Sequence, residues 1–159
     1  MGSDKVKKLI EEQVGREYTA YQFYAAASVW FDLRGFNKFS KMFQDLADEE
    51  LTHALKLRQF LVDRNYPCKQ PALDPVDPQK WQNVTTMVSE AVKLEEEFGQ
   101  HFEDMSEVAC EEGDRTSAAF LQWFLLEQVA GIKEMQDLLD LVSSGINLYQ
   151  AEHIATDEE

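Results

Sequence analysis

Four long stretches of the chain carry apolar residues at alternating steps of three and four positions. This spacing puts the apolar side chains on one face of an α-helix, and helices with a single apolar face pack into a bundle. The stretches predict helices at about 4–33, 37–64, 79–111 and 114–142, followed by a short helix at about 146–155. The alternation typical of a β-strand is absent from the sequence, so we expect an all-α protein.

The connections between these helices indicate their arrangement. The first and second helices, and likewise the third and fourth, are joined by very short turns and should form two antiparallel hairpins. Residues 65–79 link the hairpins and contain all four prolines of the chain. When extended, this linker spans roughly 50 Å, which exceeds the roughly 40 Å length of the second helix. The linker can therefore cross the whole bundle, and the chain length suits a single domain over 1–159.

Near the middle of every long helix, a residue that binds hard metal ions stands where the pattern predicts an apolar one. The interrupting residues are Glu17 in the first helix, Glu50 and His53 in the second, Glu95 in the third and Gln128 in the fourth. The midpoints of bundled helices lie in one layer, so these side chains should converge. Three carboxylates and one imidazole suit iron and leave positions open for water or dioxygen.

The predicted site is asymmetric. Glu50 and His53 lie one turn apart as Glu-x-x-His and can bind one ion together with Glu17. A second ion would have Glu95, a bridging Glu50 and, at longer range, Gln128. The apolar faces of the helices offer no basic residue to pair with these acids. Buried carboxylates without a partner are very costly. For Gln128 alone, a core amide bonded to a carboxylate is the open alternative.

Three further residues lie close to these positions along the helices. Tyr24 follows Glu17 by two turns on the same seam and could donate to a ligand or supply an electron, or could be an ordinary core tyrosine. Glu49 and Glu127 neighbour the ligands and are candidates for additional metal ligands. Exposed acids on helix faces are the alternative reading of both.

Charge and cysteine content narrow the function classes. The formal net charge is −15, with 30 acidic and 15 basic residues, which argues against nucleic acid or anionic lipid as a partner. No apolar run is long enough to cross a bilayer, so we expect no membrane association. Cys68 and Cys110 look like free thiols of a reducing compartment. We expect a cytoplasmic protein, and the Met-Gly-Ser start leaves open whether a targeting peptide has been removed.

The sequence resembles the non-haem ferritins over nearly its whole length. The matching stretches are REYTAYQFY around Glu17, DEELTH ending at His53, KLEEE containing Glu95 and FLQWFLLEQ ending at Gln128. The resemblance implies a ferritin-like four-helix bundle with a long crossover and a short fifth C-terminal helix. It also implies a catalytic H-type or bacterial-type subunit: a ferroxidase that oxidises Fe(II) with dioxygen at a di-iron centre and passes Fe(III) to a mineral core.

The resemblance carries further expectations for the site and the assembly. It places Glu17, Glu50 and His53 at the first iron, Glu95 with Gln128 at the second, and Tyr24 beside the centre. It implies a homo-oligomeric shell of 24 subunits. Those family members that bind haem have a methionine just after the bridging glutamate, whereas Leu51 stands there, so no haem is expected.

Three other functions stay open on the sequence alone. An iron-binding buffer with little catalysis would have less need of the intact ligand set. A di-iron oxidoreductase of the rubrerythrin type would be expected to have a second Glu-x-x-His, but Gly131 stands where its histidine would be. A metal-free helical interaction domain is disfavoured by the buried acids that lack basic partners.

Overall fold

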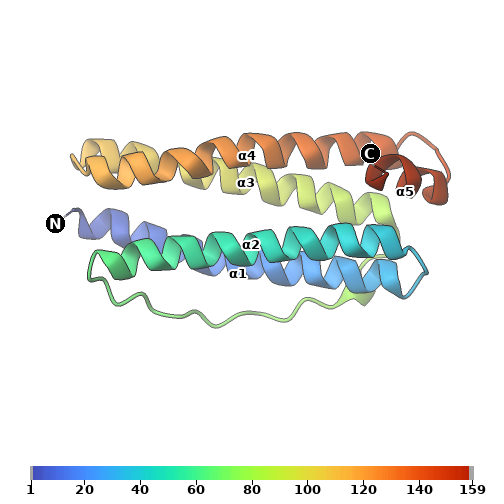
Figure 1. Ribbon diagram of the computed structural model, residues 1–159, viewed down its shortest axis with the longest axis horizontal. Helices are drawn as coiled ribbons and strands as arrows, with labels where there is room; N and C mark the ends of the chain where they lie inside the picture. The colour runs from blue at the N-terminus through green and yellow to red at the C-terminus, as the bar shows by residue number, and fades with distance from the viewer. Residues whose placement is uncertain (1, 158–159) are drawn as a thin grey trace.

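The computed structural model describes residues 2–157, which form a bundle of four long helices with a short helix at its C-terminal end (Figure 1). The helices are α1 (Asp4–Asp32), α2 (Asn37–Asp63), α3 (Val84–Glu111), α4 (Arg115–Val142) and α5 (Leu148–Thr156), with a 3₁₀ turn, η1, at Pro78–Lys80. Residues 2–157 contain no β-strand, so the expected all-α bundle is confirmed. None of the helices in this range is both long and apolar enough to cross a membrane.

The chain builds the bundle from two antiparallel hairpins, α1 with α2 and α3 with α4 (Figure 1). Gly35 and Gly113, with φ of +82° and +70°, adopt the left-handed conformation that ends the first helix of each hairpin. The crossover after α2 runs along the outside of the bundle and delivers the chain to the far end, where α3 starts. Contacts between α2 and α4 are sparse, so the seam between these two helices is the loosely closed side of the bundle.

The start of the third helix differs from the sequence expectation. A start near residue 79 is wrong, because α3 begins at Val84. Asn83 has an extended backbone and its side chain accepts a hydrogen bond from the backbone N–H of Thr86, which caps the helix at this point. Trp81 therefore precedes the helix, although its side chain is buried in the core.

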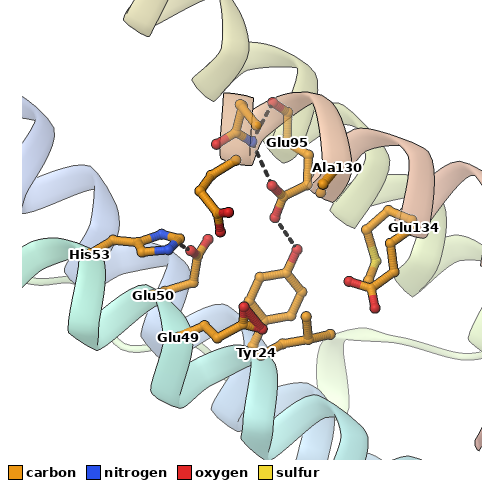
Figure 2. A pocket seen from close by; sticks show the side chains of 12 residues that line it. Tyr24, Glu49, Glu50, His53, Glu95, Ala130 and Glu134 are labelled. Atoms are coloured by element: carbon orange, nitrogen blue, oxygen red, sulfur yellow. Dashed lines mark hydrogen bonds and ion pairs between the residues drawn. The ribbon is translucent and has the colours of Figure 1, made fainter. Parts of the chain in front are cut away.

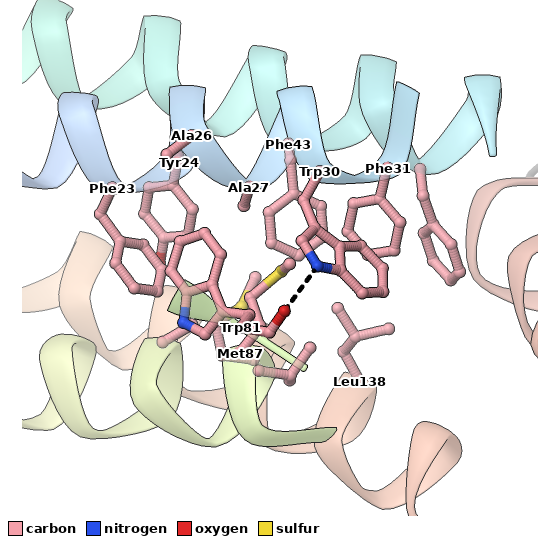
Figure 3. Close-up of a cluster of buried hydrophobic side chains, with 14 of the residues drawn as sticks. Phe23, Tyr24, Ala26, Ala27, Trp30, Phe31, Phe43, Trp81, Met87 and Leu138 are labelled. Atoms are coloured by element: carbon pink, nitrogen blue, oxygen red, sulfur yellow. Dashed lines mark hydrogen bonds between the residues drawn. The ribbon is translucent and has the colours of Figure 1, made fainter. Parts of the chain in front are cut away.

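The apolar core is divided into two parts by a polar layer near mid-length. One part gathers aromatic side chains at the α5 end, including Phe31 and Phe43, whose ring centroids are 5.1 Å apart (Figure 3). There the Trp30 indole N–H donates to the backbone carbonyl of Trp81 at 3.1 Å. The other part lies toward the opposite end and includes Phe102. Both parts fix the helices on either side of the polar layer.

Helix α5 is attached to the start of α2. No side chain of the preceding turn caps α2. Instead, the Glu152 carboxylate in α5 accepts hydrogen bonds from the backbone N–H groups of Lys38 and Phe39, both at 3.0 Å. A carboxylate at a helix N-terminus also interacts favourably with the helix dipole. The rings of Phe36 and Tyr149 add a tilted contact with centroids 4.7 Å apart, so α5 is held by both polar and apolar contacts.

Candidate metal centre

Three of the expected ligands meet inside the bundle. Oxygen or nitrogen atoms of Glu17, Glu50 and His53 all lie within 4.8 Å of one another, and this is the one such group of three His, Cys, Asp or Glu residues within 2–157. The Nδ1 atom of His53 is 2.9 Å from Oε1 of Glu50 and 3.6 Å from Oε1 of Glu17. Helix α1 supplies the first of these residues and α2 the other two, so one hairpin holds the group.

Two oxygens of this group are buried without a hydrogen bond. Among the described residues, Oε1 of Glu17 and Oε2 of Glu50 have no hydrogen-bond partner, although both side chains are almost fully buried. An unsatisfied buried carboxylate oxygen is costly and rare in folded proteins. A cation bound between these oxygens and His53 would remove that cost.

Gln13 orients Glu17, a role that sequence reasoning missed. Its side chain is fully buried, and its amide Nε2 donates to Oε2 of Glu17 at 3.0 Å. Arg16 donates in turn to the Gln13 carbonyl oxygen at 2.9 Å. These bonds turn one Glu17 oxygen away from the centre and leave the other facing His53. The signal for Gln13 was its place four residues before Glu17, one helical turn away on the same face.

Glu95 lies on the other hairpin and is held by hydrogen bonds (Figure 2). The Tyr24 hydroxyl donates to one carboxylate oxygen at 2.5 Å, and the Gln128 amide donates to the other at 2.6 Å. The same amide nitrogen lies 3.0 Å from the backbone carbonyl oxygen of Glu95. Gln128 thus acts as the core amide that bonds a carboxylate, and Glu95 stands apart from the group of three.

Gly131 makes room for this position of Glu95. A Cβ atom at residue 131 would come within 2.9 Å of Oε1 of Glu95, closer than real Cβ atoms approach such a neighbour. The Glu95 carboxylate therefore rests directly against α4, where a second histidine ligand would otherwise start. Glu95 can occupy this position because residue 131 is a glycine and not the histidine of a second Glu-x-x-His.

A cavity of about 250 Å³ opens from these residues into the seam between α2 and α4. Glu49 and Glu127 line it, as the sequence suggested, and so does Glu134, which sequence reasoning did not single out. The Glu49 side chain is exposed, but its carboxylate is partly shielded from water. This shielding, followed by the negative charge of Glu127, raises the pKa of Glu49, and the influence of His53 opposes the rise. The mouth of the cavity is therefore strongly acidic.

The electrostatics of the metal-free centre favour bound protons. Burial raises the pKa of both Glu50 and Glu95 to about 7, and the pKa of Glu17 is also raised by burial. Burial alone would lower the pKa of His53, but its close contacts and charge interactions with the carboxylates of Glu17 and Glu50 raise it to about 10. His53 is accordingly an imidazolium at neutral pH in the metal-free protein. Burial and the charge of Glu95 also raise the pKa of Tyr24, which keeps its hydroxyl a proton donor.

An aromatic wall closes the other side of His53. Its ring lies edge-on to Trp123 and Phe124, with centroids 5.4 and 5.9 Å away. The ammonium group of Lys56 sits 3.3 Å from the centroid of the Trp123 ring, and Trp123 itself is 39% exposed. The indole therefore borders both the candidate centre and the outer face of the seam.

The amino-acid sequence of this chain is similar to those of known proteins. Residues 7–144 match the model of the ferritin-like domain family. A ferritin of Mycolicibacterium smegmatis is 34% identical over 158 residues, which cover 97% of this chain and 85% of that protein. A bacterial non-heme ferritin of Staphylococcus epidermidis is 28% identical over 131 residues, covering 81% and 77%.

The fold comparison agrees with the sequence comparison. An open-pore ferritin of the archaeon Archaeoglobus fulgidus superposes with a TM-score of 0.90 at 24% identity, covering 99% of this chain and 98% of that one. At this identity the likeness concerns the fold, which is the four-helix bundle with its short C-terminal helix.

Proposed function

The chain belongs to the ferritin family, as a non-haem member, and from that premise we propose that it stores iron as a ferroxidase. Membership of this family supports iron binding and iron storage. The catalytic part of the proposal is that Fe(II) binds inside the bundle, is oxidised by dioxygen and moves as Fe(III) to a mineral core. The single observation that carries it is the group of Glu17, Glu50 and His53, whose ligand atoms lie within 4.8 Å of one another and in which two buried carboxylate oxygens have no hydrogen bond to any described residue.

The first iron position is the group of three on α1 and α2. We assign Oε1 of Glu17, the Glu50 carboxylate and Nδ1 of His53 as its ligands. Mixed carboxylate and imidazole ligands suit Fe(II) and leave coordination positions open. His53 must lose its extra proton before its nitrogen can bind a metal ion, so iron and a proton compete for the centre.

The second iron position depends on Glu95. Glu50 would bridge to it through the oxygen that now has no partner among the described residues. Glu95 can turn toward the ion only if its bonds to Tyr24 and Gln128 lengthen or exchange. Gln128 would then offer its carbonyl oxygen at longer range.

Two acids at the mouth of the cavity complete the proposed ligands. Glu49 and Glu127 lie beside the second iron position and are proposed as additional metal ligands. Burial and, after it, the charge of Glu127 raise the pKa of Glu49, and the repulsion between the two acids would fall when a cation binds between them.

The reaction balances with two ferrous ions. Each Fe(II) gives up one electron, and dioxygen takes both electrons with two protons and leaves as hydrogen peroxide. The residues of this chain hold the ions at adjacent positions and supply oxygen ligands that favour Fe(III) over Fe(II), because hard anionic oxygens prefer the higher charge. Tyr24 retains its proton and positions Glu95.

Ferritin-family proteins assemble as oligomeric shells, and we propose 24 subunits for this one. Large apolar side chains form an exposed row on α4 of the isolated subunit, where Trp123, Leu126 and Val129, at 39%, 70% and 68% exposed, follow one another at steps of three residues. Residues of this kind normally mark surfaces that are covered in an assembly. The negative surface would in turn attract ferrous ions to the shell.

Aerobic oxidation of Fe(II) by a Glu50→Ala variant tests the assignment. This variant removes the shared ligand, so rapid oxidation should disappear, whereas Glu96→Gln, an exposed acid on α3, should oxidise iron as the wild type does. Rapid oxidation by Glu50→Ala would refute the proposed centre. A wild type that binds Fe(II) but oxidises it slowly would favour the iron-buffer alternative.

A further inference from the structure

Two side chains of α1 connect the first iron position to the outer surface of the bundle. Gln13 is fully buried, and its amide nitrogen Nε2 donates to Oε2 of Glu17 at 3.0 Å. Arg16 donates from Nη1 to the carbonyl oxygen of Gln13 at 2.9 Å. The Arg16 side chain is 32% exposed and lines a cavity of about 450 Å³ between α1, α3 and the crossover. A hydrogen-bonded path therefore runs from solvent to a proposed iron ligand.

This path lies apart from the cavity of the candidate centre. That cavity opens toward the seam between α2 and α4, and neither Gln13 nor Arg16 lines it. The cavity beside Arg16 lies on the other side of the bundle, where residues of α1 and α3 face each other. Gln13 and Arg16 can therefore influence a bound iron ion only through Glu17.

Arg16 determines which end of the Gln13 amide faces Glu17. The two ends of an amide have nearly the same shape, so packing alone does not distinguish the donating NH₂ group from the accepting oxygen. A guanidinium group only donates hydrogen bonds, so Arg16 binds the oxygen end of Gln13 and leaves the NH₂ group to face Glu17. Reversal of the amide would place its oxygen against a carboxylate oxygen and deprive Glu17 of its donor.

The donor from Gln13 sets the direction of the Glu17 carboxylate. While Oε2 accepts from Gln13, Oε1 lies 3.6 Å from Nδ1 of His53 and has no hydrogen bond to any described residue. Glu17 is fully buried, so solvent is not at hand to replace a lost donor. The bond at Oε2 thus keeps the free oxygen pointed toward the group of three.

Arg16 has a second partner, which offers a matched control. Its Nη2 atom lies 3.9 Å from Oε1 of Glu12, whose side chain is 46% exposed. Ion pairs of such exposure contribute little to stability. If Arg16 acts on the centre through Gln13, the contact with Glu12 can be removed without effect on iron binding.

We propose that Arg16 and Gln13 are positioning residues of the first iron site. Arg16 fixes the direction of the Gln13 amide from the outer surface, and the amide fixes the direction of the Glu17 carboxylate. This inference rests on the proposed ferroxidase function, because it requires Glu17 to bind iron. Loss of a residue that orients a metal ligand typically weakens metal binding about ten- to a hundredfold.

Anaerobic calorimetric titration of the assembled protein with Fe(II) measures the affinity of the first site. Gln13→Met keeps the length of the side chain without a donor and should weaken binding about ten- to a hundredfold, and Arg16→Met should weaken it about tenfold. Arg16→Lys should restore most of the affinity, because an ammonium group can donate the same single bond. Glu12→Gln should bind Fe(II) as the wild type does. Wild-type affinity in Arg16→Met would overturn the inference.

A double-mutant cycle tests whether Arg16 acts through Gln13. The variant that combines Gln13→Met with Arg16→Met should bind Fe(II) no more weakly than Gln13→Met alone, because Arg16 then has no amide to orient. A general loss of stability would not depend on Gln13 in this way. Losses of affinity that multiply in the double variant would show that the two residues act separately, and would overturn the proposed path.

Glu17→Ala separates failure of this inference from failure of the function on which it rests. Weaker binding in Glu17→Ala together with wild-type affinity in Arg16→Met and Gln13→Met would overturn the positioning role alone. Wild-type affinity in Glu17→Ala would overturn both the positioning role and the proposed first iron site, because Glu17 would then not be a ligand.

Discussion

Binding of the first ferrous ion should release protons and should weaken steeply as the pH is lowered. In the metal-free centre, burial would lower the pKa of His53, but its close contacts with the carboxylates of Glu17 and Glu50 raise it to about 10. Burial, opposed by the bond to His53, raises the pKa of Glu50 to about 7. A metal ion needs the unprotonated nitrogen and the ionised carboxylate. Protons that occupy these atoms must therefore leave when iron binds.

The two pKa values set the size of the effect. At pH 7, His53 should give up about one proton and Glu50 about half a proton, because the pKa of Glu50 is close to that pH. From pH 8 to pH 7, the proton on His53 alone weakens binding about tenfold per unit, or by about 1.4 kcal/mol. Below pH 7 Glu50 takes up its own proton, and the loss approaches about a hundredfold per pH unit.

Anaerobic calorimetry with Fe(II) measures the released protons directly. Titrations at pH 7 in two buffers with different enthalpies of protonation give the number of protons from the difference in apparent heat. Glu96→Gln should release as many protons as the wild type, because this acid is exposed on α3. Heats that do not depend on the buffer would refute the reasoning, because His53 would then have to be neutral before iron arrives.

Two substitutions probe other parts of the structure. Gly131→Ala should displace Oε1 of Glu95 from its bond to Gln128, since the new Cβ would lie 2.9 Å from that oxygen. Loss of this one charged hydrogen bond, about 1.5 kcal/mol, should strengthen anaerobic binding of the second Fe(II) about tenfold. Unchanged affinity would show that this bond does not restrain Glu95. At Asp114, burial opposes ionisation, but bonds from Ser117, Ser3 and Arg64 lower the pKa from 3.8 to about 2. The stability that these bonds give the folded protein is present above pH 4 and is lost as the pH falls toward 2. Asp114→Asn should therefore lower the free energy of unfolding by about 2 kcal/mol at pH 7 and make it depend less on acid. A denaturant titration that gives equal free energies of unfolding for both proteins would contradict this.

The helices were predictable because their apolar positions repeat with the period of the α-helix, and each predicted helix carries one buried face. The start of α3 was not, because it depends on the backbone of the crossover: Asn83 caps the helix only once the preceding turn at Pro78–Lys80 has set its direction. Periodicity reports which face is buried and says little about where the first turn begins.

The candidate centre, too, was predictable from the sequence only in part. The interrupted seams indicated that Glu17, Glu50 and His53 would meet, and the structure brings them within 4.8 Å of one another. The pattern of apolar and polar positions does not predict which hydrogen bonds the polar side chains make. Gln13 and Gln128 are both buried amides beside a glutamate, and only the side-chain conformations decide that each donates to a carboxylate.

The unequal state of the two carboxylates sets an order of events at the centre. In the proposed centre, Glu17 and Glu50 each have an oxygen without a hydrogen bond among residues 2–157, so the first ion displaces only the proton between His53 and Glu50. Glu95 must give up hydrogen bonds to Tyr24 and Gln128 before it can bind the second ion, and each such bond to a charged group costs about 1.5–3 kcal/mol to lose. The same bonds form again when that ion departs, so they weaken its binding and favour its release. A centre with one prepared and one restrained position therefore suits iron that passes through, as storage requires, better than iron that stays as a cofactor.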